Sequence, residues 1–362
     1  MLANPEYPSI YNGLKVYSGY FFNILPTILK ENTEEYNFKE YLITKNESVN
    51  NKMNIVLIYG ESFNYYNQSL YGYEYNTTPN LLELSKDYKN FTYKKGIASA
   101  IATQQSIPAF FNLQREPKNY KMQINMKFNL FKLAKEQGFK TFFISAQKVG
   151  LFNNLGRQFI DVFITVEDEK ELFDIKRDEA LLTILKNQEL SDKNFIVLHQ
   201  RNIHSPYEKN YSHKQKEFDK FESSYDNATL YNDYLYKHII TYFTHHSQNP
   251  LYFFITSDHG ELTGQNGLYG HVSLIPEVAN IPIILYTRNA NSNIQNEFKN
   301  MFMPTHYELG ILLAKIMGYT IINPNILDDI FYINGNDSMG RFGYIKLQKD
   351  KKNNKINYEV IN

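Results

Sequence analysis

The sequence predicts a three-layer α/β/α sandwich built around a central, mostly parallel sheet. Five short runs of β-branched and aromatic residues lack the alternation of a half-exposed strand, which is typical of strands buried on both faces. Helical patterns separate these runs, and strands that alternate with helices form a sheet covered on both sides. The chain has 362 residues, 43% of them hydrophobic, which is enough to bury one large core.

The expected elements follow in chain order. The five strand-like runs lie at 54–59, 140–145, 195–199, 252–257 and 281–286. Residues 128–137 repeat apolar side chains at helical spacing and are followed by Gly138, a residue that commonly ends helices. A second amphipathic helix is expected at 225–244, with Asp226 near its start.

The two ends of the chain differ from its middle. Residues 11–30 mix aromatic and aliphatic side chains around Pro26, and either a helix packed on the domain or a segment lying at a lipid interface fits them. Residues 343–362 hold two strand-like stretches around a polar turn, which predicts a closing β-hairpin. We therefore expect an N-terminal linker or juxtamembrane helical segment at 1–52, a catalytic domain at 53–320 and a C-terminal extension at 321–362.

Composition excludes several classes of function. The 38 basic and 38 acidic residues cancel, so a broad cationic surface for nucleic acid is not expected. The absence of cysteine excludes disulfides, thiolate zinc sites and a cysteine nucleophile, so a metal must use imidazole, carboxylate or hydroxyl ligands. No apolar run approaches the length of a membrane-spanning helix.

A candidate metal-binding motif, Asp258-His259-Gly260-Glu261, directly follows the fourth run. The carboxylate of Asp258 and the imidazole of His259 can reach one divalent cation, because the turn beyond a strand ends the alternation of side chains. Gly260 allows that turn to be tight. Glu61 follows the first run, and taken alone it is better read as a solvated strand end than as a metal ligand.

Three further histidines occupy loops or strand ends. His199 ends the third run, where a hydrogen-bonded core residue is the favoured interpretation. His204 lies in a loop that a proline closes, which makes it the better catalytic candidate. His271 follows a glycine-rich stretch and taken alone reads as an ordinary loop histidine.

The candidate nucleophile is Thr103, within the stretch ASAIATQQSIP at 98–108. A hydroxyl at a helix N-terminus lies near backbone N–H groups that suit an incoming phosphate. A metal ion bound to that oxygen would lower its pKa. Without the other motifs Thr103 would be read as a helix N-cap, and Ser99 and Ser106 are rival nucleophiles.

These motifs, taken in order, resemble the phosphoethanolamine transferase branch of the alkaline phosphatase superfamily. The resemblance extends from about residue 54 to about residue 318. It rests on GES at 60–62, LYGYEYNTTPNL at 70–81, TQQSIP at 103–108, NLFKLAKEQGFKTFFISAQ at 129–147, HQRNIHSPY at 199–207, SSYDNATLYNDY at 223–234 and SDHGELTGQNGLYGH at 257–271.

The resemblance implies an alkaline phosphatase-like fold and a set of roles. A catalytic zinc ion would be held by Glu61, Thr103, Asp258 and His259. His204 and His271 would flank the phosphoryl group or a second metal, with His199 close by. The sequence departs from the family's pattern at two positions beside these histidines, Ser205 and Gly270, and it lacks the disulfides common in the family. The acceptor side of the site is therefore the part of the family's pattern that can least be carried over to this chain.

The implied reaction moves phosphoethanolamine from phosphatidylethanolamine through a phosphothreonine to lipid A, a core sugar, another glycan or a protein. The implied location is the periplasmic face of a Gram-negative inner membrane, reached through an N-terminal anchor missing from this monomeric chain. A phosphoglycerol transferase of the lipoteichoic acid type, suggested by Glu61-Ser62-Phe63, and a metal-dead binding domain are the alternatives. A sulfatase is disfavoured because its Cys/Ser-x-Pro-x-Arg signature is absent around Thr103.

Overall fold

A computed structural model describes residues 38–46, 50–211, 215–271, 273–327, 329–335 and 343–361. The predicted segment at 11–30 lies outside these residues. Residues Glu40–Asn362 belong to one compact unit. Within the described ranges, no helix combines the length and the apolar character needed to cross a bilayer.

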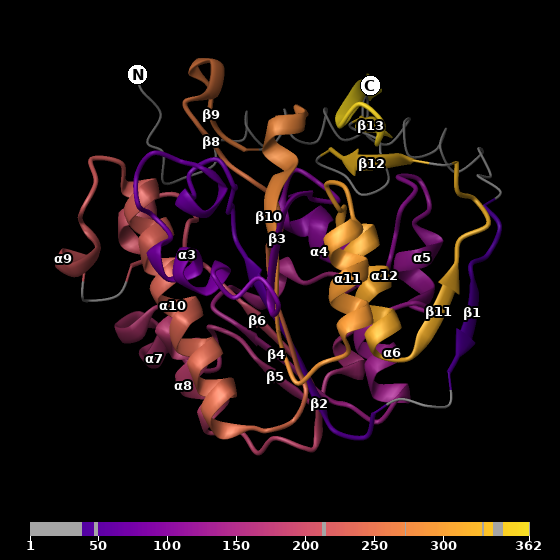
Figure 1. Cartoon of the computed structure of the whole chain (residues 1–362), viewed down its shortest axis with the longest axis horizontal. Coiled ribbons are helices and arrows are strands. Elements are labelled where there is room, and N and C mark those ends of the chain that lie inside the picture. Colours follow the sequence, from indigo (N-terminus) through magenta and orange to yellow (C-terminus); the bar gives the residue numbers. More distant parts are fainter. Residues whose placement is uncertain are drawn as a thin grey trace, which may run out of the picture. The chain divides into compact units, whose positions relative to one another are not determined.

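A seven-stranded sheet forms the middle layer, with helices on either side (Figure 1). The strand order is β3-β10-β7-β2-β6-β4-β5. Neighbouring strands from β7 to β5 are parallel, whereas β10 is antiparallel to both β7 and β3. The predicted three-layer sandwich with a mostly parallel sheet is confirmed. The strands are β2 (Met53–Gly60), β3 (Phe91–Ile97), β4 (Lys140–Ser145), β5 (Val162–Ile164), β6 (Lys193–His199), β7 (Leu251–Ser257) and β10 (Asn280–Arg288).

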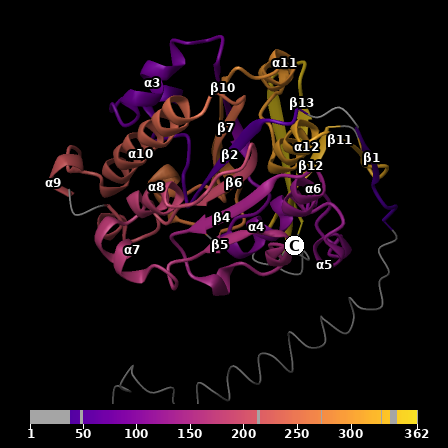
Figure 2. The same cartoon turned by 90° about the horizontal axis from the view of Figure 1, so that it is seen from below.

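Helices cover both faces of this sheet, because alternate residues of each central strand point into two separate cores. Ile55 and Leu57 join the core under α4, α6, α11 and α12, whereas Val56 and Ile58 join the core under α3, α7, α8 and α10. Figure 2 shows the two groups on opposite sides of the strands. The helices are α3 (Pro79–Ser85), α4 (Thr103–Phe111), α5 (Lys121–Asn125), α6 (Leu130–Glu136), α7 (Lys170–Lys176), α8 (Glu179–Lys186), α9 (Gln215–Phe218), α10 (Ser224–His246), α11 (Ser292–Asn300) and α12 (His306–Ile316).

Both predicted helices are present, and local signals set their ends. The Asn129 side chain accepts from the backbone N–H groups at the start of α6, and Gly138 follows that helix in the left-handed conformation, with φ +79°. Ser223 caps α10 by accepting from the backbone N–H of Asp226. Short 3₁₀ turns lie at Ser69–Tyr71, Val149–Leu151, Arg157–Phe159, Tyr207–Lys209, Gln265–Gly267 and Pro276–Ala279.

The C-terminal residues form an antiparallel sheet of three strands, β12 (Ile330–Asn334), β13 (Tyr344–Asp350) and β14 (Lys355–Ile361). The predicted hairpin is confirmed as β13 and β14, and β12 adds a strand that was not predicted. Asn334 N–H donates to Ser99 O at 2.8 Å, and Ile101 N–H donates to Asn334 O at 3.2 Å. The end of β12 therefore pairs with the segment that leads into α4.

A two-stranded ladder joins the beginning of the described chain to a later segment. β1 (Leu42–Lys45) pairs antiparallel with β11 (Tyr319–Ile322). Two further short strands, β8 (Leu262–Thr263) and β9 (Tyr269–Gly270), form a hairpin after β7. The division at residues 52 and 320 stays a prediction, and backbone pairing crosses both of these points.

Candidate active site

The candidate metal ligands lie at the carboxyl edge of the sheet because two neighbouring parallel strands end there. β2 and β7 pair in register up to Gly60 and Ser257. Glu61 follows the first of these residues, and Asp258 and His259 follow the second. The backbone N–H of Asp258 donates to Gly60 O at 3.0 Å, which continues the ladder into the site. Such an edge is where ligands bind in open α/β sheets.

Thr103 is the first residue of α4, and its side chain points at these ligands. Its Oγ1 donates to Asp258 Oδ2 at 2.6 Å and lies 3.2 Å from Glu61 Oε2 and 3.4 Å from His259 Nε2. The interpretation of Thr103 as an N-cap is wrong, because Ala102 occupies the cap position in an extended conformation. The hydroxyl is therefore directed to the candidate metal ligands.

The rival serines are engaged elsewhere. The Ser106 hydroxyl donates to Asp258 O, a backbone carbonyl, at 2.6 Å. The Ser99 hydroxyl lies 3.2 Å from Ser106 O and 3.3 Å from Nδ1 of the buried His306. Both serines belong to a buried network beneath the site, and Thr103 is the hydroxyl of the three that points at the carboxylates.

The side chains of Glu61, Asp258 and His259 could hold one metal ion. Their ligand atoms lie within 4.8 Å of one another, and the three residues are no more than 1% exposed. His259 Nδ1 donates to Gly260 O at 2.8 Å, which orients the ring so that Nε2 faces the two carboxylates, 3.4 Å from Glu61 Oε1 and from Asp258 Oδ2. Two carboxylates, an imidazole and a hydroxyl form a donor set that fits zinc.

The electrostatics of the two carboxylates also favour a bound cation. Burial and the charge of Glu61 raise the pKa of Asp258 to about 6. Burial would raise the pKa of Glu61 as well, but the charges of His259 and His204 outweigh it and lower that pKa to about 2. The carboxylates of Glu61 and Asp258 repel each other when both are ionised, and a cation bound between them would offset that repulsion.

Gln147 positions Glu61, a role that was not predicted. Its amide donates to Glu61 Oε2 at 2.8 Å and to Gln200 O at 2.9 Å. The Ser62 hydroxyl donates to the other Glu61 oxygen at 2.7 Å. Gln147 comes two residues after β4, at the same sheet edge as the predicted residues, and this placement is the sequence signal that could have identified it.

His199 is a buried residue of the sheet, which agrees with the favoured structural interpretation. Its Nδ1 lies 2.8 Å from Ser145 Oγ, and the rings of Phe143 and Phe152 pack against it. Burial lowers the pKa of His199 to about 4. Among the described residues it joins no group of potential metal ligands. It reaches the site through Gln147, whose Nε2 lies 3.3 Å from His199 Nε2.

A second group of potential metal ligands joins His259 to Glu261 and His271. The β8–β9 hairpin returns the chain so that His271 Nδ1 lies 2.6 Å from Glu261 Oε2. The Tyr207 hydroxyl donates to the other Glu261 oxygen at 2.7 Å. Glu261 was not among the predicted site residues, although its place in the Asp-His-Gly-Glu motif was a signal.

The surroundings of His271 favour the protonated form of its imidazole. Burial lowers its pKa, but the hydrogen bond and charge of Glu261, together with the charges of Glu61 and Asp258, outweigh burial and raise the pKa above its ordinary value. The rings of His259 and His271 lie 4.4 Å apart between centroids. An imidazole that keeps its proton near neutral pH can donate to a phosphoryl or leaving-group oxygen.

His204 lies on the loop after β6 and is half-buried. Its Nδ1 is 2.6 Å from Ser205 O, and its charge acts on the pKa of Glu61. It belongs to neither group of potential metal ligands among the described residues.

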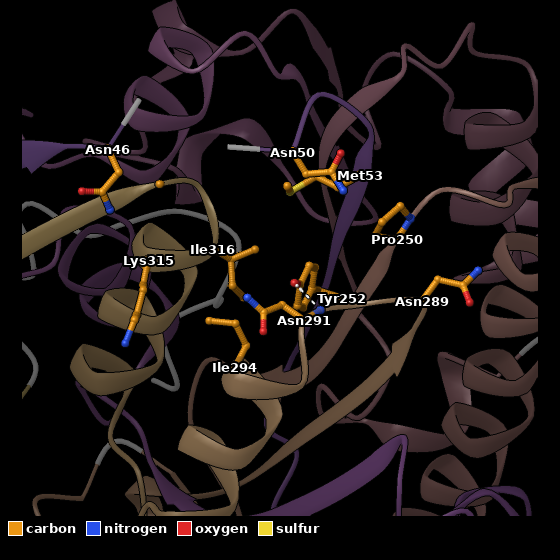
Figure 3. A pocket seen from close by; sticks show the side chains of 11 residues that line it. Asn46, Asn50, Met53, Pro250, Tyr252, Asn289, Asn291, Ile294, Lys315 and Ile316 are labelled. Atoms are coloured by element: carbon orange, nitrogen blue, oxygen red, sulfur yellow. Dashed lines mark hydrogen bonds between the residues drawn. The ribbon is translucent and has the colours of Figure 1, made fainter. Parts of the chain in front are cut away.

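A cavity of about 430 Å³ lies at the opposite edge of the sheet, where β2 and β7 begin (Figure 3). Met53, Pro250 and Tyr252 line it together with Asn291 and Lys315. None of the candidate metal ligands, and neither His204 nor His271, lines this cavity. The site at the carboxyl edge is therefore separate from it.

The sequence of this chain is similar to one family model and to several curated proteins. A family model described as sulfatase matches residues 53–305. Phosphoethanolamine transferase EptC of Escherichia coli strain K12 is 30% identical over 246 residues, covering 60% of this chain and 41% of that protein. The Kdo(2)-lipid A phosphoethanolamine 7''-transferase of the same strain is 24% identical over 297 residues, covering 74% and 52%. The chain spans about half the length of these curated relatives.

Solved structures share the fold. The C-terminal periplasmic domain of EptC from Escherichia coli aligns with a TM-score of 0.63 at 23% identity, covering 83% of this chain and 93% of that one. A crystal structure described as the same domain in complex with Zn aligns with a TM-score of 0.62 at 22% identity, with the same coverage.

Proposed function

Because this chain belongs to the sulfatase family of the alkaline phosphatase superfamily, we propose that it is a zinc-dependent phosphoethanolamine transferase. The proposal rests above all on the Thr103 hydroxyl, which begins a helix and points at Glu61, Asp258 and His259. Phosphoethanolamine is the favoured cargo because curated relatives carry that name.

The chain's own residues would hold and orient the nucleophile. Asp258 accepts the hydrogen bond of the Thr103 hydroxyl, and the first turn of α4 directs backbone N–H groups to an incoming phosphate. A zinc ion held by Glu61, Asp258 and His259 would supply positive charge beside Thr103 Oγ1 and lower the pKa of the hydroxyl.

Two displacements at phosphorus complete the proposed reaction. The Thr103 hydroxyl gives its proton to Asp258 Oδ2, its hydrogen-bond acceptor, as Oγ1 forms a bond to the phosphorus of phosphatidylethanolamine and the bond from phosphorus to the glycerol oxygen breaks. His271 or His204 gives that oxygen a proton, so diacylglycerol leaves. An acceptor oxygen then bonds to phosphorus and gives its proton to the same histidine, while the bond from phosphorus to Thr103 Oγ1 breaks and Asp258 returns the proton to Thr103. The chain is unchanged over the cycle, as ping-pong transfer requires.

The acceptor in this proposal is a cell-envelope molecule: lipid A, a core sugar, another glycan or a protein. Lipid A is favoured among these because the name of one relative includes it. The proposed location is the periplasmic face of the inner membrane, with the chain acting as a monomer and an N-terminal anchor bringing it to the lipid donor. The structures that share this fold include a domain described as periplasmic.

The covalent intermediate provides the direct test. The chain is incubated with zinc and phosphatidylethanolamine vesicles, quenched and digested with trypsin, and the peptide that contains Thr103 is examined by mass spectrometry. We expect the added mass of phosphoethanolamine on Thr103 and no such mass in Thr103→Ala. If phosphatidylglycerol vesicles instead give a phosphoglycerol adduct on Thr103, the chain is a phosphoglycerol transferase, the alternative function. If neither lipid gives an adduct, the mechanism is contradicted.

The acceptor is tested in cells. Surface molecules from cells with and without the full-length protein are compared by mass spectrometry. We expect phosphoethanolamine on one class of molecule only when the protein is present. The same modification in cells that carry Thr103→Ala would contradict the proposal.

A further inference from the structure

His306 is a fully buried histidine beneath the candidate active site, and both of its ring nitrogens have partners with fixed roles. It is the first residue of α12. Its Nδ1 accepts from the backbone N–H of Ser99 at 3.1 Å, and its Nε2 donates to the backbone carbonyl of Ser257 at 2.9 Å. A backbone N–H can only donate and a carbonyl can only accept, so the ring proton is on Nε2. Burial lowers the pKa of His306 to about 3, which keeps the ring neutral at neutral pH.

The two hydrogen-bond partners of His306 belong to the two segments that carry the reacting groups. Ser99 lies in the segment that leads into α4, four residues before Thr103. Ser257 ends β7 and is directly followed by Asp258, the hydrogen-bond acceptor of the Thr103 hydroxyl. One imidazole therefore spans the space between the backbone that precedes the nucleophile and the strand end that carries the candidate metal ligands.

A second contact holds Thr103 from its other side. Ser106 lies three residues after Thr103 in α4, and its hydroxyl donates to the backbone carbonyl of Asp258 at 2.6 Å. The His306 ring borders this contact, because its Nδ1 lies 3.4 Å from Ser106 Oγ. The chain is thus tied to the end of β7 at Ser99, before the nucleophile, and at Ser106, after it. The ring of His306 provides the first of these ties and packs beside the second.

The start of α12, from which the His306 ring extends, is itself held in place. Thr305 and Glu308 form a capping box: the Glu308 carboxylate accepts from the backbone N–H of Thr305 at 2.8 Å, and the Glu308 N–H donates to the Thr305 hydroxyl at 3.3 Å. The buried Lys349 of β13 donates to the same carboxylate. The ring of Phe110 packs against the imidazole, with centroids 4.9 Å apart. These contacts leave the imidazole little freedom to turn or to shift.

We propose that His306 is a positioning residue for phosphoryl transfer, because its ring holds the segment before α4 at a fixed distance from the end of β7. This distance directs the Thr103 hydroxyl at Asp258 Oδ2, 2.6 Å away. The inference rests on the proposed function, in which this hydroxyl oxygen bonds to phosphorus. His306 acts through Thr103, since its hydrogen bonds go to backbone groups. A misplacement of about 1 Å can cost about a hundredfold in rate, so the loss of either hydrogen bond should slow the reaction.

Two substitutions separate the two hydrogen bonds of the ring. The amide oxygen of an asparagine lies near the place of Nδ1 in a histidine, so His306→Asn keeps an acceptor for the Ser99 N–H and loses the donor to Ser257 O. The amide nitrogen of a glutamine lies near the place of Nε2, so His306→Gln keeps this donor and loses the acceptor. Both variants keep a neutral polar side chain in the buried network, which favours folding.

The control variant lowers stability at a place away from the site. Asp233→Ala removes a buried carboxylate of α10 that accepts from the backbone N–H groups of Asn80 and Leu81 in α3. Diacylglycerol release from phosphatidylethanolamine vesicles is measured for the wild type and the three variants, each loaded with zinc and held well below its Tm. Rates are divided by the folded fraction, so that a loss of stability does not count as a loss of kcat.

We expect kcat to fall at least about tenfold in His306→Asn and in His306→Gln, because either change frees one end of the bridge and misplaces the Thr103 hydroxyl. KM for the lipid should stay within about twofold, since the position of this hydroxyl affects the chemical step rather than lipid binding. Asp233→Ala should keep kcat and KM within about twofold of the wild-type values. A wild-type kcat in either His306 variant, a loss that lies in KM instead, or an equal loss of kcat in the control would overturn the inference.

Backbone amide exchange separates this inference from the proposed function. Hydrogen exchange of the Ser99 N–H is followed by NMR in the metal-free chain. We expect it to be at least about tenfold faster in His306→Gln, which lacks the acceptor, than in His306→Asn, which keeps it. Equal exchange in the wild type and His306→Gln would overturn the inference. If the wild type releases no diacylglycerol although the exchange rates differ as expected, the proposed function fails and the bridge between the two segments stands. If the wild type and both His306 variants release diacylglycerol equally, the positioning role alone fails.

Discussion

The side chain of Thr103 is half-buried and contributes little to the core, so its replacement separates chemistry from folding. We expect Thr103→Ala to reduce diacylglycerol release to the uncatalysed background, because no oxygen remains to bond to phosphorus. Thr103→Ser keeps the hydroxyl and should retain measurable activity. Lipid turnover is measured together with thermal unfolding, which should be unchanged. Full activity in the alanine variant would contradict the assignment of Thr103 as the nucleophile.

Substitution of Gln147 tests whether its hydrogen bond positions the Glu61 carboxylate for zinc binding. Gln147→Leu removes the donor to Glu61 while keeping similar volume, so we expect zinc affinity to fall by about ten- to a hundredfold. Competition with a chelator of known affinity measures the change. Gln158→Leu, at an exposed glutamine, is the control and should bind zinc as the wild type does. Equal affinity in the two variants would show that Gln147 does not position the ligand.

At the residue level, the strand end predicted Asp258 and His259 as metal ligands, whereas Glu61 was proposed as one through the family resemblance. Glu61, Asp258 and His259 converge because two parallel strands stop in register, and Thr103 meets them as the first residue of α4. The place of Gln147 two residues after β4 was a signal for the sheet edge, but it did not identify Glu61 as the partner. Its role depends on the lateral order of β4, β6 and β2, which no local pattern reveals.

Helix α3 shows how one element depends on another that is distant in sequence. Its N-cap, Thr78, makes no capping hydrogen bond, and Asp233 of α10 accepts from the backbone N–H groups of Asn80 and Leu81 instead. We expect Asp233→Ala to lower the free energy of unfolding by about 1–3 kcal/mol, since buried N–H groups lose their acceptor. Urea unfolding measures this change. Asp192→Ala, at an exposed aspartate, should have little effect.

The same carboxylate should make stability depend on pH. Burial raises the pKa of Asp233 to about 6, so the folded state holds this proton more tightly than the unfolded state does. Its contribution to the free energy of unfolding therefore increases as the pH falls from about 7 to about 4. Asp233→Asn cannot titrate, so the wild type should gain about 1–3 kcal/mol relative to this variant between pH 8 and pH 4. A pH-independent difference between the two would contradict the shifted pKa.

Among the elements, the strands buried on both faces were predicted and the edge strands were not. β2, β6 and β7 are buried at every residue, which is why their continuous apolar runs identified them. β3 is an edge strand with exposed Tyr93 and Lys95, and β5 has three residues, so neither produces such a run. β12 is short, and its pairing with distant segments carries no local signal.

The whole domain should respond to zinc, because its ligands join segments far apart in the chain. Zinc that binds only the folded state at a hundredfold excess over its Kd would add about 2.7 kcal/mol to the free energy of unfolding. We therefore expect a chelator to lower Tm and added zinc to restore it. Elemental analysis of the purified chain checks the occupancy. No bound metal, and none after dialysis against zinc, would favour the metal-dead binding domain.

The pairing of β12 with the segment before α4 also sets an order of events during synthesis. Ser99 and Ile101 leave the ribosome more than 200 residues before their hydrogen-bond partner, Asn334. Until that strand emerges, the backbone that leads into Thr103 lacks two of its hydrogen bonds. A nascent chain that has not yet reached Asn334 therefore carries Thr103 without these two hydrogen bonds, and the segment that leads into α4 is completed by a strand made more than 200 residues later.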